Sequence, residues 1–273
     1  MHAQSLIALA FCQLLVLAPA QAAQQAAPLV IGETFTLQSK VLNETRRMNV
    51  YLPPGYAESA GQRFPVLYMP DGGLAEDFLH VAGLVQVSVG NGTMRPFVLV
   101  GIENTERRRD LTGPTQNEED EKIAPRVGGS ATFRQFLRDE LMPDVQARYR
   151  TTSETAIVGE SLAGLFVIET FLLEPDLFDT YIAIDPSLWW NDGALVKSAP
   201  ERLRARTKKA EQWLWFSSSG EERGDGTERF AAALQQAHTP SGLLWRFEKM
   251  PQEKHSTIYH PAALMAFRAV FRP

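Results

Sequence analysis

The segment TAIVGESLAGLF, residues 155–166, places a run of apolar and β-prone residues before Gly159-Glu160-Ser161 and a second apolar run after it. This order predicts a buried strand that turns sharply into a helix, with Ser161 at the turn. Gly159 and Ala163 flank the serine at minus two and plus two, where only small side chains fit such a turn. Ligands bind where parallel strands end. Ser161 is therefore a candidate nucleophile, although an ordinary Gly/Ser turn would give the same pattern.

The rest of the chain alternates strand-like and helix-like segments around this turn. An antiparallel pair is expected at 33–42 and 46–56, followed by strands at 64–69, 97–102, 155–159, 180–185, 212–218 and 243–250. Helices are expected at 74–87, 133–149, after Ser161, at 228–236 and from Pro261 onward. The alternation predicts the α/β class, with a mostly parallel sheet of about eight strands flanked by helices and no separate lid domain. The irregular segment 103–130 is expected to form the rim of a site.

The N-terminal segment predicts export. Residues 1–22 contain no Asp, Glu, Lys or Arg, and an apolar core precedes the small-x-small site Ala20-Gln21-Ala22. We expect a signal peptide over 1–22, with a membrane anchor as the alternative, then a linker over 23–32 and one domain over 33–273. The single cysteine, Cys12, lies in the leader. The mature chain is then periplasmic or secreted and has no thiol.

The charge distribution excludes several partner classes. The net charge is −5 and no long block of one sign dominates, which argues against nucleic acid. No stretch after the leader is long and apolar enough to span a bilayer, so we expect no membrane contact after its removal.

A serine nucleophile needs a base. The chain has five histidines: His2 in the leader, His80 and His238 in predicted helices, and His255 and His260 after the last strand. His260 directly precedes Pro261, the expected start of the closing helix. We therefore favour His255, in the loop PQEKHST, as the base. The alternative is that His255 is an ordinary exposed histidine.

The acid that would orient the histidine has several candidates. Glu221, Glu222 and Asp225 follow the strand at 212–218, and Asp185 ends the strand at 180–185. We favour Glu222 and leave Asp185, Asp225 and Glu221 open. Each of them could equally be a solvated loop carboxylate.

A tetrahedral oxyanion needs two backbone N–H donors. One is expected from Leu162, directly after the serine, and the other from the loop after the third strand, YMPDGGLAEDF. The glycine pair of this loop lets the backbone approach a substrate, and Gly73 is our choice of donor. A simple turn is the alternative. Asp71, just before the pair, is a candidate for substrate contact.

These segments together resemble the putative esterase family of the α/β-hydrolase superfamily, and most closely its siderophore-esterase branch. The likeness covers nearly all of the chain after the leader and rests on VLYMPDGG, VLVGIENTERRRDLTGPT, GESLAGLF, FDTYIAIDPSLWWND and KHSTIYH. It implies an α/β-hydrolase fold and places Glu222 where related sequences carry the acid. This chain departs from its relatives at Asp185, where serine is common, and at Ser256, where glycine is common. A Ser-His pair without an acid is also compatible with the resemblance.

The expected function is hydrolysis of a small-molecule carboxylic ester through an acyl-enzyme. Trp189, Trp190 and Arg107 are candidates for contacts with an aryl or siderophore-type substrate. The tryptophans could instead pack in the core, and Arg109 could pair structurally with Asp110. No cofactor or metal is expected, because no metal-ligand motif is present. Acyl transfer to a hydroxyl acceptor and a non-catalytic binding protein are the alternatives.

Overall fold

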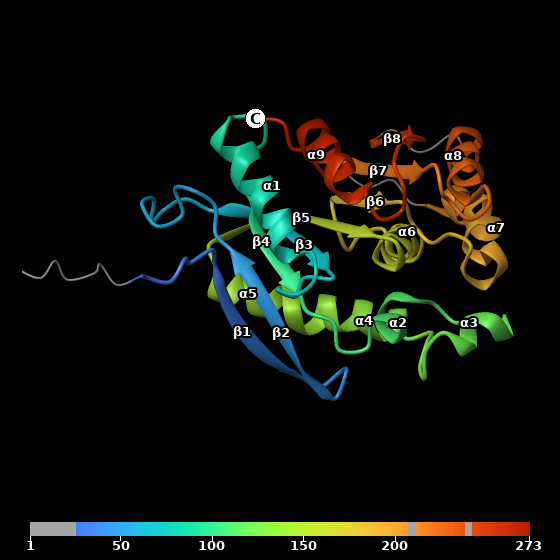
Figure 1. Cartoon of the computed structure of the whole chain (residues 1–273), viewed down its shortest axis with the longest axis horizontal. Helices are drawn as coiled ribbons and strands as arrows, with labels where there is room; N and C mark the ends of the chain where they lie inside the picture. Colours follow the sequence, from blue (N-terminus) through green and yellow to red (C-terminus); the bar gives the residue numbers. More distant parts are fainter. Residues whose placement is uncertain (1–25, 207–210, 238–241) are drawn as a thin grey trace, which may run out of the picture. The chain divides into compact units, whose positions relative to one another are not determined.

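A computed structural model describes residues 26–206, 211–237 and 242–273 (Figure 1). The chain divides into two compact units, Met1–Val30 and Ile31–Pro273, and the second contains every helix and strand named below. The expected leader at 1–22 lies outside the described residues, as does His238, so both assignments stay predictions. Within the described residues no helix is long and apolar enough to cross a membrane.

The second unit is built on one eight-stranded sheet of order β1-β2-β4-β3-β5-β6-β7-β8. β1 pairs antiparallel with β2, β2 pairs antiparallel with β4, and all other neighbours are parallel. The strands are β1 (Glu33–Ser39), β2 (Glu44–Tyr51), β3 (Phe64–Pro70), β4 (Val98–Ile102), β5 (Thr151–Glu160), β6 (Thr180–Ile184), β7 (Gln212–Ser219) and β8 (Leu243–Met250). The predicted α/β class, the opening antiparallel pair and the mostly parallel sheet are confirmed.

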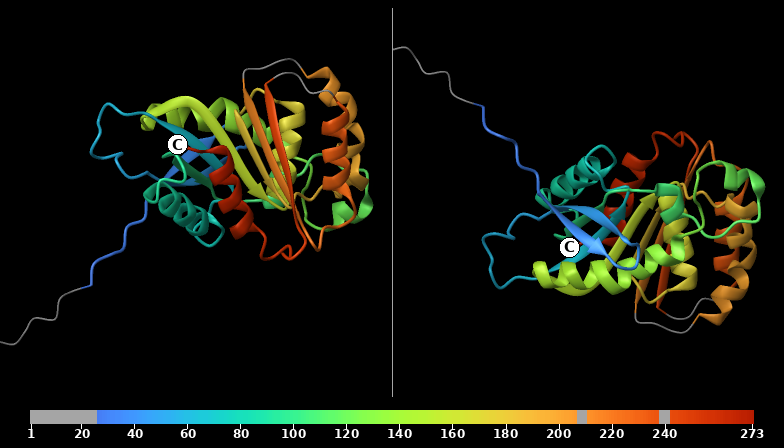
Figure 2. Two further views of the ribbon diagram at one scale, coloured as in Figure 1. Left: turned by 90° about the horizontal axis from the view of Figure 1, so that it is seen from above. Right: turned by 90° about the horizontal axis from the view of Figure 1, so that it is seen from below.

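Helices cover both faces of this sheet (Figure 2). One face packs against α4 (Ser130–Phe136), the π-helical turn η1 (Leu137–Leu141), α5 (Met142–Arg148), α6 (Leu162–Leu173), α7 (Trp190–Ala205) and α8 (Gly226–Gln236). The other packs against α1 (Phe78–Gly90) and α9 (Tyr259–Val270). Alternate residues of β3 enter opposite cores, with Phe64 and Tyr68 on the first face and Leu67 on the second. The uninterrupted apolar runs of the central strands follow from this double burial.

Some boundaries differ from the prediction. α1 begins at Phe78 instead of residue 74, and α9 begins at Tyr259 instead of Pro261. The segment 103–130 is not wholly irregular, because it contains the short helices α2 (Arg107–Leu111) and α3 (Glu118–Lys122). The predicted helix at 133–149 passes through η1 just before Pro143, whose nitrogen cannot donate to the preceding turn.

Three polar residues lie at or just after the carboxyl ends of adjacent parallel strands. Asp71 follows β3, Ser161 follows β5 and Asp185 follows β6, and their φ angles are 58°, 60° and 42°. Side chains other than glycine rarely adopt this backbone region, and such residues cluster at functional sites. The fold therefore directs attention to this edge of the sheet.

Candidate active site

Ser161 stands at a strained turn between β5 and α6. Its φ and ψ are 60° and −119°, and its N–H donates to the carbonyl of Ile184 at 3.0 Å. A Cβ on Gly159 would lie 2.7 Å from the backbone carbon and Cβ of Ala163, and one on Gly164 would lie 3.0 Å from the carbonyl oxygen of Ile184. These distances explain physically why the turn takes glycine at both positions and keeps a small residue between them.

The structure brings His255 to this serine. His255 Nε2 lies 3.0 Å from Ser161 Oγ, and its Nδ1 lies 2.6 Å from Asp185 Oδ2. The ring belongs to the loop between β8 and α9, as expected from the position of His255 after the last strand. His260 lies elsewhere, stacked on His80 with ring centroids 5.0 Å apart.

Asp185, not the favoured Glu222, is the carboxylate that contacts the imidazole. Glu222 instead accepts hydrogen bonds from Thr227 N and Oγ1, at 2.8 and 2.5 Å, beside the first turn of α8. Asp225 pairs with Arg229 at 3.6 Å, and Glu221 accepts from the backbone N–H of His255 at 3.3 Å. The predicted position of the acid is therefore corrected. Asp185 can reach His255 because it follows β6, and β6 pairs directly with β5, the strand that leads into Ser161.

Hydrogen bonds shift the pKa values of Asp185 and His255 in opposite directions. Asp185 is buried and accepts from Ser219 N and Oγ at 2.7 and 2.8 Å. Burial by itself would raise the pKa of Asp185, but the hydrogen bonds from His255 and Ser219 outweigh it and lower that pKa. The hydrogen bond to Asp185 in turn raises the pKa of His255. Asp185 is thus ionised at neutral pH and oriented toward Nδ1.

The two expected oxyanion donors differ in availability. Leu162 is the first residue of α6, so its N–H has no acceptor within the helix. The N–H of Gly73 donates to Glu76 Oε2 at 2.6 Å and is therefore occupied. A Cβ on Gly72 would lie 2.2 Å from the backbone nitrogen of Ile102, so this glycine serves close backbone packing.

Asp71 and Arg107, both candidates for substrate contact, pair with each other. Arg107 Nε and Nη2 donate to the two carboxylate oxygens of Asp71 at 2.7 and 2.8 Å, and Asn104 Nδ2 donates to Asp71 Oδ1 at 2.5 Å. Arg107 also lines a cavity of about 430 Å³, together with Glu106, Arg108, Arg109, Ala124, Pro125 and Arg126. This cavity lies in the segment 103–130, which we expected to be the rim.

The two tryptophans differ in burial. Trp190 is 4% exposed and donates from Nε1 to the carbonyl of Gly113 at 2.8 Å, as in the core packing that was considered as the alternative. It also lines a cavity of about 380 Å³, so substrate contact by Trp190 stays a prediction. Trp189 is partly buried, and the guanidinium of Arg223 lies 4.5 Å from its ring centroid. Trp189 is therefore the more exposed ring of the two.

Arg109 and Asp110 belong to a structural ion-pair network beneath the rim. Arg109 Nε contacts Asp110 Oδ1 at 2.6 Å, and the fully buried Arg46 contacts Asp110 Oδ2 at 2.6 Å. Glu44 accepts from both arginines, and its pKa falls to about 2 because these hydrogen bonds outweigh its burial. The structural alternative considered for Arg109 and Asp110 is the one that the structure shows.

Two residues near the serine were not singled out from the sequence. Glu160 Oε1 lies 3.3 Å from His255 Nε2, and burial raises the pKa of Glu160 to about 7. Ser187 donates its backbone N–H to the carbonyl of Ser161 at 3.0 Å, and its Oγ lies 3.4 Å from Ser161 Oγ. The place of Glu160 directly before the nucleophile was the only available signal.

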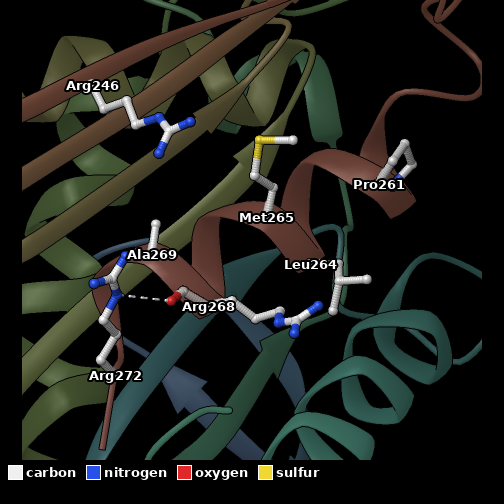
Figure 3. A pocket seen from close by; sticks show the side chains of 7 residues that line it. All are labelled: Arg246, Pro261, Leu264, Met265, Arg268, Ala269 and Arg272. Atoms are coloured by element: carbon white, nitrogen blue, oxygen red, sulfur yellow. Dashed lines mark hydrogen bonds between the residues drawn. The ribbon is translucent and has the colours of Figure 1, made fainter.

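A separate cavity of about 380 Å³ lies beside α9 (Figure 3). Arg246 reaches it from β8, and the other lining residues, Pro261, Leu264, Met265, Arg268, Ala269 and Arg272, come from α9 and the residues after it. None of them belongs to the site described above. Among the described residues no group of three or more His, Cys, Asp or Glu side chains could hold a metal ion.

Two characterised proteins are similar to this chain in sequence. Ferri-bacillibactin esterase BesA of Bacillus subtilis is 30% identical over 187 residues, which are 62% of this chain and 63% of that protein. Apo-salmochelin esterase of Escherichia coli is 28% identical over 217 residues, which are 73% of this chain and 65% of that protein. The matched regions thus span just under two thirds of both relatives.

Solved structures and a family model also match this chain. The crystal structure of an IroE-like serine hydrolase from Shewanella oneidensis superposes with a TM-score of 0.80 at 28% identity, covering 88% of this chain and 80% of that one. The BES protein of Bacillus cereus shares the fold, with a TM-score of 0.78 at 21% identity over 90% of this chain and 98% of that one. Residues 39–263 match the family described as Putative esterase. The chain therefore belongs to the Putative esterase family, and its relatives there include siderophore esterases.

Proposed function

We propose that this protein is a serine carboxylic-ester hydrolase that works through an acyl-enzyme. The observation that carries the proposal is the hydrogen-bonded chain Ser161–His255–Asp185, with heavy-atom distances of 3.0 and 2.6 Å. A serine activated by an imidazole that a buried carboxylate orients is the constellation of nucleophilic acyl transfer. Membership of an esterase family supports the same reaction class.

In the proposed mechanism each of the three groups has one role. Asp185 holds the proton of His255 on Nδ1, which leaves the Nε2 lone pair facing Ser161 Oγ. Nε2 takes the hydroxyl proton as Oγ attacks the ester carbonyl, and then gives that proton to the departing alkoxide. Water, deprotonated by the same nitrogen, cleaves the acyl-enzyme and restores the serine.

The oxyanion would be held by backbone N–H groups. Leu162 supplies one donor at the start of α6. Gly73 can supply the second only when the Glu76 carboxylate leaves its N–H, since the two are 2.6 Å apart in this structure. We therefore propose that Glu76 shifts when an ester binds.

The proposed substrates are siderophore-type or aryl esters. This substrate class is supported by two relatives that are named as siderophore esterases, BesA at 30% identity and apo-salmochelin esterase at 28% identity. The partly buried ring of Trp189 and the arginine-lined cavity at the rim provide surfaces for an aromatic or anionic group. We also propose that the chain is exported, because its first 22 residues have the composition of a leader.

A panel of esters tests the proposal. Wild type, Ser161→Ala and the control Ser153→Ala are compared on ferric and iron-free trilactone siderophores, p-nitrophenyl acetate and methyl ferulate. Ser153 is exposed near the start of β5, at the opposite end of this strand from Ser161, so its loss should leave turnover unchanged. Activity that disappears only in Ser161→Ala supports the mechanism. Full activity of Ser161→Ala on the preferred ester contradicts it.

Added alcohol acceptors would reveal acyl transfer through ester products.

A further inference from the structure

Glu160 is placed to act on the imidazole. It is the last residue of β5, its side chain is 15% exposed, and its Oε1 lies 3.3 Å from His255 Nε2. The same nitrogen lies 3.0 Å from Ser161 Oγ. Nε2 therefore faces two oxygen atoms from consecutive residues, of which only the hydroxyl has a role in the mechanism above.

The interaction of Glu160 with His255 changes sign during the reaction. In the resting enzyme the imidazole proton is on Nδ1 beside Asp185. An ionised Glu160 then faces the unprotonated Nε2 and accepts no hydrogen bond from it. When Oγ attacks, Nε2 acquires the serine proton and the ring becomes an imidazolium. The Nε2–H then has a carboxylate within reach. An interaction that is stronger in the transition state than in the ground state raises the rate.

The charged groups around Glu160 allow it to be ionised when this is needed. His255 and Arg107 favour its charged form, whereas Asp71 and Asp185 oppose it. The Tyr259 hydroxyl, fully buried and raised in pKa, is a neutral neighbour. Burial is the largest influence and brings the pKa of Glu160 to about 7. The pKa of His255 is also raised, and each of the two groups shifts the pKa of the other toward its charged form, so their titrations are coupled.

We propose, building on the hydrolase function above, that Glu160 is a positioning residue whose carboxylate accepts a hydrogen bond from the imidazolium Nε2–H of His255. The proton moves from Ser161 Oγ to Nε2 and from there to the departing alkoxide, and Glu160 binds it by hydrogen bonding without taking it. Glu160 thereby adds a second carboxylate to the one that Asp185 presents at the opposite side of the ring.

The pH dependence of kcat/KM with p-nitrophenyl acetate, from pH 5 to 10, tests this role. Glu160→Gln keeps the shape of the side chain and removes its charge, and Glu160→Asp keeps the charge. An opposite charge within about 4 to 6 Å shifts a pKa toward the charged form, by about 1 to 3 for an aspartate beside an arginine, and a carboxylate beside a histidine acts in the same sense. His255 is half exposed, so we expect the acid limb of Glu160→Gln to move down by about one pH unit and kcat to fall about tenfold. Glu160→Asp should stay close to the wild-type limb.

Glu222→Gln is the matched control. It also removes a partly buried carboxylate, but one that is bound to Thr227 and not to the imidazole. Its acid limb should coincide with that of wild type. A second readout, independent of turnover, is the ring pKa of His255 measured by NMR in the Ser161→Ala background, which should fall when Glu160→Gln is added.

The outcomes separate this inference from the proposed function. An unchanged acid limb together with an unchanged His255 pKa in Glu160→Gln overturns the role of Glu160, while an inactive Ser161→Ala would still support the hydrolase. Full activity of Ser161→Ala would overturn both. If Glu160→Gln does not fold, Glu160→Ala carries the same test in both measurements.

Discussion

Replacing Asp185 by asparagine tests the acid that the structure assigns. Asp185 Oδ1 accepts from Ser219 N, and Oδ2 accepts from Ser219 Oγ and faces His255 Nδ1. In Asp185→Asn the amide oxygen keeps the Ser219 N–H and the amide nitrogen points at Nδ1. An N–H donor there forces the imidazole proton onto Nε2, which can then no longer take the proton of Ser161.

The expected loss in kcat/KM is large. Reversal of the tautomer in a serine-protease triad lowers kcat by roughly 10⁴-fold, which corresponds to about 5 kcal/mol of transition-state stabilisation. We expect a loss of this order in Asp185→Asn, and a loss below about threefold in Glu222→Gln, whose carboxylate contacts Thr227. Initial rates with p-nitrophenyl acetate, together with melting curves to show that both variants fold, measure the difference. Near-normal activity of Asp185→Asn with an inactive Glu222→Gln would refute the assignment.

Three further changes have outcomes set by the structure. Asp110→Asn replaces the carboxylate partner of the fully buried Arg46 by a neutral amide and should lower the free energy of unfolding by about 3 to 5 kcal/mol. A thermal melt should show a decrease in Tm of roughly 10 °C. An unchanged Tm would show that this ion pair is dispensable. Gly159→Ala places a Cβ 2.7 Å from Ala163, so it should cost about 1 to 3 kcal/mol of folding free energy and reduce kcat more than tenfold. Wild-type turnover of this variant would mean that the turn at Ser161 tolerates a larger residue. The pKa of Glu160 is raised from 4.5 to about 7 in the folded state, so the wild-type protein loses stability as pH rises through this range. Glu160→Gln should therefore be more stable than wild type by up to about 3 kcal/mol at pH 8.5 and little different near pH 4.5. Equal melting curves of the two proteins at both pH values would contradict the burial of this charge.

Much of the fold could be predicted because its determinants are local. Strands buried on both faces appear as uninterrupted apolar runs, and the eight-stranded sheet follows them closely. The serine was recognisable because a sharp turn requires small neighbours that can be read directly from the chain. His255 emerged because the sequence places the other histidines in the expected leader, in predicted helices or beside a proline. Both expectations depended on residues that are close together in sequence.

The acid could not be chosen in this way, because the choice depends on strand order and on competing partners. Asp185 lies beside Ser161 since β6 pairs directly with β5, with Glu160 opposite Ile184. Glu222 lies after the next strand over, and Thr227 engages its carboxylate. Neither the pairing register nor the competing threonine is visible as a pattern in the chain.

Burial within the rim was equally inaccessible to prediction. Trp190 is buried in the apolar core, where its indole N–H donates to the carbonyl of Gly113, 77 residues away in sequence. The Gly73 N–H is occupied because Glu76 folds back onto it. Both contacts depend on the conformation of loops, which composition does not determine.

The central claim is that Ser161 is the nucleophile. The most direct test is covalent labelling of the folded protein with a fluorophosphonate, followed by peptide mapping by mass spectrometry. We predict a single adduct on Ser161, formed much more slowly when His255 is replaced by alanine. An intact Ser161 after prolonged incubation, or an adduct confined to another serine, would contradict it.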